Sequence, residues 1–175
     1  MLDFDTMHKS GTFNRVANFA NTIVEMVAEH YGEGRTGCVL TFFDQSHEVR
    51  RFIQYPIGVI DPSKIHLYHK FSLEKPTRAA RLGRVNSYMA DHDPENGRHA
   101  GDFLQDISTG VRSSVSGFEQ LDDVAFNAYV NYVAGSLTLV DVFRIFSEHG
   151  YVENALQARF ATLEALCNVY ETDVD

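Results

Sequence analysis

Two pairs of short strand-forming segments constrain the fold of this chain more than any other feature. In the first pair, residues 38–43 (CVLTFF) are followed by a polar turn at 44–47 and a second segment at 48–55. In the second pair, residues 103–107 and 111–116 are separated by Ser-Thr-Gly. Short segments rich in β-branched and aromatic residues, joined by such turns, are typical of β-hairpins. We therefore expect an antiparallel sheet.

A helix precedes the first hairpin. Between residues 13 and 31, apolar side chains recur every three or four positions, which is typical of a helix with one buried face. Ser10 or Thr12 is expected to cap its start, and Gly32 to close its end.

The region between the hairpins is expected to be helical as well. Pro56, Gly58 and Pro62 are expected to break the chain before this region, which spans residues 65–83. Pro76 lacks an amide donor and disfavours helix just before it. We expect either a kink there or two helices, the first ending near residue 74 and the second starting at Pro76.

After the second hairpin, the chain is expected to be entirely helical. One helix follows Asp122 and Asp123, whose carboxylates suit a helix start. Residues 136–175 then predict a helical hairpin with Thr138 as a cap. Its first helix is expected to turn Leu139, Val142, Phe143 and Phe146 inward, and its second carries Leu156, Phe160, Leu163, Leu166, Cys167 and Tyr170.

This order of elements predicts an α+β fold in which helices cover an antiparallel sheet. We expect a core domain over residues 1–135. Residues 136–175 are expected to form an appendage that packs on this core or lies in an oligomer interface.

Composition narrows the possible partners. The chain has 24 acidic and 15 basic residues and a net charge of −9, which disfavours non-specific nucleic-acid binding. Cys38 and Cys167 form no CxxC pair, and the polar start MLDFDTMHKSGTF differs from a signal peptide. No apolar run approaches the length of a membrane span. We expect a cytoplasmic protein with neither nucleic-acid nor membrane partners.

Three segments, in this order, resemble a known family. These are KPTRAARLGR at residues 75–84, the strand leading to Gly117, and Asp-Asp-Val-Ala at 122–125. The chain is similar, over about residues 13–134, to the haem-degrading-domain family. That family includes glycolate-operon accessory proteins, haem-binding sensor proteins and the C-terminal domain of some corrinoid adenosyltransferases. Pro76 and the sparsely glycine-containing AGDFLQDISTG depart from the family pattern.

The resemblance implies a profilin-like fold and a ligand-binding or accessory module, often a homo-oligomer and sometimes associated with haem or a corrinoid. It implies no shared catalytic mechanism. It also places the helix at residues 75–84 beside the closing strand.

An anionic ligand is therefore expected between this helix and the strand–turn that follows it. The candidate binding residues are Lys75, Arg78, Arg81, Ser116, Gly117 and Asp122. Arginine binds carboxylate and phosphate in a bidentate manner, although basic residues at helical spacing also form solvated stripes.

Two groups of residues are candidate metal ligands. His66 and His69 lie three apart in a helical segment and would share a face, where they would serve as ligands to haem iron. The alternative is a solvated helix face. The loop DHDPENGRH at residues 91–99 contains metal-binding residue types but matches no known spacing, and a mobile polar loop is the simpler interpretation.

The sequence thus predicts a small-molecule-binding accessory or sensor protein for haem, another tetrapyrrole or a different anionic ligand. The alternative is a non-catalytic assembly protein that oligomerises through the stripe of Leu156, Phe160, Leu163 and Leu166. Because GxSxG, GxGxxG and P-loop motifs are absent, an enzyme is the less favoured interpretation.

Overall fold

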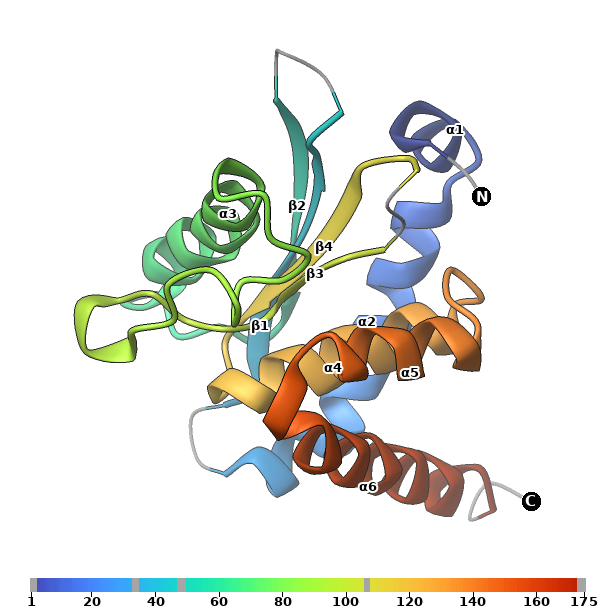
Figure 1. Cartoon of the computed structure of the whole chain (residues 1–175). Helices are drawn as coiled ribbons and strands as arrows, with labels where there is room; N and C mark the ends of the chain where they lie inside the picture. Colours follow the sequence, from blue (N-terminus) through green and yellow to red (C-terminus); the bar gives the residue numbers. More distant parts are fainter. Residues whose placement is uncertain (1–2, 33–34, 47–49, 106–107, 173–175) are drawn as a thin grey trace.

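A computed structural model describes residues 3–32, 35–46, 50–105 and 108–172, and the side chains of the last helix up to residue 168. The chain has an α+β fold in which a four-stranded antiparallel sheet lies between helices (Figure 1). The strands, in their order across the sheet, are β2 (Arg51–Gly58), β1 (Gly37–Asp44), β4 (Val111–Ser116) and β3 (Asp102–Leu104). The helices are α1 (Phe4–Lys9), α2 (Thr12–Tyr31), α3 (Ile65–Arg81), α4 (Gln120–Val133), α5 (Leu139–Ser147) and α6 (Glu153–Thr172). Two short 3-10 helices are η1 (Pro94–Asn96) and η2 (Gly150–Val152).

Both predicted hairpins are present, and the central pair β1–β4 joins them into one sheet. The predicted chain break at Pro56 is wrong, because β2 continues through this residue and ends at Gly58. Since β2 is an edge strand, proline is tolerated there without the loss of an internal ladder bond. The predicted strand positions 48–49 and 106–107 lie outside the described residues.

Helix α2 covers one face of the sheet, together with α4. Phe13 of α2 stacks on Phe42 of β1 with their ring centroids 4.2 Å apart, inside the main apolar core. Neither Ser10 nor Thr12 caps this helix, because the N-cap is Gly11 in a left-handed conformation and no side chain caps it. Gly32 ends the helix as predicted.

Helix α3 covers the opposite face, which is polar. It continues through Pro76, so the prediction of two separate helices is wrong. Beneath it, Gln54 Nε2 lies 3.1 Å from Thr41 Oγ1 and 3.0 Å from Ser72 Oγ. This hydrogen bonding satisfies polar side chains between sheet and helix that burial would otherwise penalise.

The C-terminal helices pack on the same core. Thr138 and Asp141 form a capping box at the start of α5, which confirms Thr138 as the cap. The predicted inward positions of Leu139 and Phe143 are wrong, because these side chains are 41% and 49% exposed. Leu139 and Phe143 lie at the border of the buried face of α5, which Val142, Ile145 and Phe146 form.

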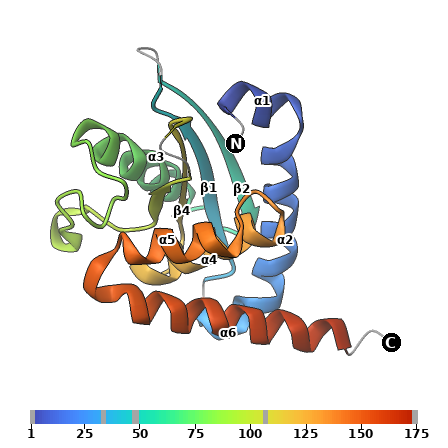
Figure 2. The same cartoon turned by 45° about the vertical axis from the view of Figure 1, so that its right-hand side comes forward.

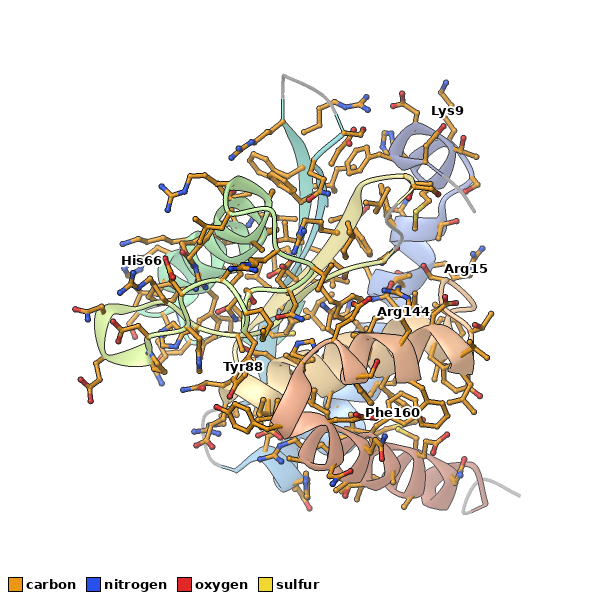
Figure 3. The ribbon with its side chains drawn as sticks, in the orientation of Figure 1. Lys9, Arg15, His66, Tyr88, Arg144 and Phe160 are labelled. Atoms are coloured by element: carbon orange, nitrogen blue, oxygen red, sulfur yellow. The ribbon has the colours of Figure 1, made fainter. Side chains whose placement is uncertain are left out.

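Helix α6 lies beneath α4 and α2 (Figure 2). Its stripe of Leu156, Phe160 (labelled in Figure 3) and Leu163 belongs to the main core. The Phe160 ring lies 5.4 Å from that of Tyr129 in α4. These side chains, which the alternative prediction assigned to an oligomer interface, therefore pack against other helices of the same chain. Among the described helices, none has the length and apolarity that crossing a bilayer requires.

Candidate functional site

A hollow of about 830 Å³ opens at the end of the sheet where β4 leaves it and β1 enters it. Its walls come from α3, from the turn between β4 and α4, and from single residues of three other segments. Sequence-distant residues therefore meet here, most of them on a regular element or its immediate end, whereas His99 lies in the loop before β3.

One wall is a single face of α3. Lys64, Tyr68, Phe71 and Lys75 follow one another at steps of four, three and four residues, which brings them onto one side of a helix. Of these four residues, Lys75 alone was a predicted binding residue. The same spacing in the sequence was the signal that would have revealed the other three.

The floor is a buried ion pair. Lys75 Nζ lies 2.8 Å from Asp123 Oδ2 and donates a second hydrogen bond of 2.6 Å to the carbonyl oxygen of Val115. Asp123 Oδ1 accepts from the amides of Gly117 at 3.2 Å and Phe118 at 2.9 Å. Burial raises the pKa of Asp123, and Lys75 and these two amides act in the opposite direction. Asp123 thus fastens the turn to α3 and does not cap α4.

Gly117 is required by close packing. A Cβ atom at this position would lie 2.5 Å from the Cβ of Cys38 and 2.6 Å from the carbonyl oxygen of Gly37. The glycine therefore lets the turn pass against β1, and Ser116 beside it reaches the hollow.

Three cationic side chains stand around the mouth of the hollow. Arg35 is paired with Glu119 at 2.7 Å, and Arg159 of α6 is paired with Asp122 at 2.8 Å. Lys64 is exposed; after the hydrogen bonds from Ser63, its ammonium also lowers the pKa of Asp61, three residues earlier. The predicted site residue Asp122 thus lies behind Arg159 and does not line the hollow.

Aromatic side chains form the apolar walls, and their packing fixes them in place. Phe118 stacks on Tyr31 at 4.3 Å, and Phe71 meets the ring of His99 edge-on at 5.1 Å. Burial lowers the pKa of His99, as do Lys75 and Arg78, so its imidazole is neutral at pH 7.

Arg78 and Arg81 lie outside the hollow. Arg78 is buried and donates to the carbonyl oxygens of Ala90 at 2.5 Å and His99 at 2.7 Å. It holds the loop at residues 85–101 against α3 and so sets the position of His99. Arg81 is exposed near the end of α3.

The predicted histidine ligands do not meet at the hollow either. His66 is exposed on α3 (Figure 3), whereas His69 Nδ1 lies 3.0 Å from Gln54 Oε1. Neither lines the hollow, so a haem placed in it would not be ligated by this pair.

The loop at residues 91–99 contains η1 and is tied together by Asp93, which bonds to Asn96 and Arg98. Within the described residues, no three His, Cys, Asp or Glu side chains group closely enough to hold a metal ion.

Comparison of the chain with models of known protein families, with curated proteins and with solved structures gave no match. The site is therefore interpreted from its own geometry.

Proposed function

We propose that the protein binds a small organic anion in the hollow between α3 and the β4–α4 turn, and that it serves as an accessory or sensor protein. The observation that carries this proposal is the composition of one hollow, in which cationic side chains surround fixed aromatic walls. Its volume of about 830 Å³ lies within the range of small-molecule sites, about 300–1,000 Å³.

The charge around the hollow contrasts with that of the whole chain. The protein has a net charge of −9, yet four cationic residues (Arg35, Lys64, Lys75 and Arg159) line this one hollow, against two carboxylates, Glu119 and Asp123. The start of α4 also faces it, and the amides of Gln120 and Leu121 have no hydrogen-bond partner in the described chain. The positive end of a helix favours negative charge, so it acts in the same direction as the cations.

Haem or another tetrapyrrole remains within the proposed ligand class, because it combines a planar apolar ring with carboxylates. Of the described histidines, His99 is the one that lines the hollow, and its neutral imidazole has the lone pair that an axial ligand needs. Bound haem would supply a metal centre. The chain would supply His99, the aromatic walls and the cations at the mouth.

Native mass spectrometry of the chain, purified without denaturant, tests this proposal. We expect the protein to retain a small molecule, identifiable by mass after extraction. Gln120→Trp places an indole in the hollow and should abolish retention, whereas Val140→Trp, on the exposed face of α5, should not. An unmodified chain that carries no added mass, or equal retention by both variants, would contradict the proposal.

A further inference from the structure

The segment that joins β4 to α4 lines the hollow and contains hydrogen-bond donors that the described chain does not use. The amides of Gly117 and Phe118 are used, because both donate to Asp123 Oδ1. The amides of Gln120 and Leu121, in the first turn of α4, have no acceptor within the described residues. The hollow is therefore bordered by a pair of free backbone donors.

Helix α4 begins without a side-chain cap. Its N-cap residue, Glu119, forms no capping hydrogen bond, and its carboxylate is instead paired with Arg35 at 2.7 Å. The free amides of a first turn point away from the helix and carry the positive end of its dipole. This end of α4 therefore favours an anionic acceptor in the hollow.

The hydroxyl of Ser116 is an independent indication of a ligand. Thr41, which pairs with Ser114 in the sheet, donates to Ser72 of α3, so Ser114 and Ser116 both face α3. Ser116 is 6% exposed and lines the hollow, yet its hydroxyl has no hydrogen-bond partner among the described residues. A buried hydroxyl without a partner is costly, and an acceptor on a bound ligand would satisfy it.

We infer that the anionic group of the ligand binds at the start of α4, where the amides of Gln120 and Leu121 and the hydroxyl of Ser116 donate hydrogen bonds to it. This inference rests on the proposed function and locates the anion within the hollow. The ligand class is an aromatic oxyanion, a carboxylate or a phosphate, because each has several acceptor oxygens for these donors. Its ring would lie against Phe118, which stacking on Tyr31 holds in place.

Three probes with one ring system test the nature of the bound group: 2-naphthoate, 2-naphthyl phosphate and the neutral 2-naphthamide. In isothermal titration calorimetry, the better of the two anions should bind about tenfold more tightly than the amide, because hydrogen bonds to an ionised acceptor are the stronger ones. That anion identifies the ligand as a carboxylate or a phosphate. An amide that binds as tightly as the better anion would overturn the inference.

Ser116→Ala tests the hydroxyl. It should weaken binding of the better anion about tenfold without lowering the free energy of unfolding of the free protein, because the hydroxyl has no partner to lose. A serine with a merely structural role would destabilise the protein when replaced and leave the affinity unchanged.

Ser114→Ala is the matched control. Ser114 lies two residues earlier on the same face of β4, and its buried hydroxyl also lacks a partner, but it does not line the hollow. This variant should bind the anion as the unmodified chain does. Equal affinities of Ser116→Ala and Ser114→Ala would overturn the inference.

Proline at position 120 tests the backbone amides. Proline is tolerated at the first position of a helix, and Glu119 already has the extended conformation, with a ψ of 140°, that a residue before proline adopts. Gln120→Pro removes the amide donor, whereas Gln120→Ala removes the side chain and keeps the donor. We expect the proline variant to bind the anion about tenfold more weakly than the alanine variant, with the same circular dichroism spectrum. Equal affinities of two folded variants would contradict a site at the start of α4.

Failure of the inference and failure of the proposed function are distinguishable. If an anion binds but the two serine variants bind it equally, the inference fails and the proposed function stands. If no probe binds but the purified chain retains another molecule, Ser116→Ala should retain less of it than Ser114→Ala, and equal retention overturns the inference. If no probe binds and nothing is retained, the proposed function itself fails, and the inference with it.

Discussion

Replacing Asp123 with asparagine is expected to lower the free energy of unfolding by about 3–5 kcal/mol, because it leaves the ammonium of Lys75 buried without its counter-charge. Both side chains of this pair are almost completely buried, at 0% and 4% exposure. The amide would also offer one acceptor oxygen where the carboxylate now serves Lys75, Gly117 and Phe118. Urea unfolding followed by circular dichroism measures the difference.

Two companion variants distinguish burial from the mere loss of a charge. Glu119→Gln removes an exposed partner of Arg35 in the same turn, and we expect a change below about 1 kcal/mol. Lys75→Met combined with Asp123→Asn removes both charges but keeps a side-chain oxygen for the amides of Gly117 and Phe118, and should recover part of the stability that Asp123→Asn alone loses. A loss below about 1 kcal/mol in Asp123→Asn would show that the pair does not hold α3 to the turn.

Acidification is expected to destabilise the protein through His149. This side chain lies between α5 and α6, is fully buried, and its Nδ1 is 2.7 Å from the carbonyl oxygen of Ile145. Burial lowers its pKa to about 4, whereas the unfolded chain has the ordinary value of about 6.5.

As the pH falls, His149 is therefore protonated at a higher pH in the unfolded chain than in the folded protein. The stability that the neutral imidazole provides is fully present above pH 6.5 and is lost as the pH falls from about 6.5 to about 4, in total about 3 kcal/mol. Unfolding free energies measured across this range should show the slope in the unmodified chain. His149→Phe, which keeps an aromatic ring beside Tyr88, should flatten it, and His66→Gln on the surface should leave it unchanged. A slope that persists in His149→Phe would assign the effect to other groups.

Much of the fold follows from local sequence signals. The periodicity of residues 13–31 and the two hairpins were sufficient to predict α2 and the antiparallel sheet. Pro56 and Pro76 misled the prediction because their effect depends on tertiary position. Pro56 lies in an edge strand of the sheet, and Pro76 lies inside α3, which its packing on the sheet holds together.

The candidate site was only partly predictable. Lys75, Ser116 and Gly117 line the hollow, as proposed from the order of the motifs. Arg35 and Arg159 reach it from opposite ends of the sequence, and no local pattern links two positions so far apart. Arg78 shares the helical spacing of the basic residues, but its orientation depends on the loop that folds over it.

Mapping of backbone amide shifts by ¹H–¹⁵N correlation spectroscopy tests the location of the binding site most directly. The probe is an equimolar mixture of benzoate, 2-naphthoate, indole-3-acetate and octanoate, added to the unmodified chain. We predict that the largest shifts occur at Gly117, Phe118, Gln120 and Leu121, with none at Phe52 or Val140, which are exposed outside the hollow. Shifts confined to the shallow groove along α2 around Asn18, or no shifts at all, would contradict the account.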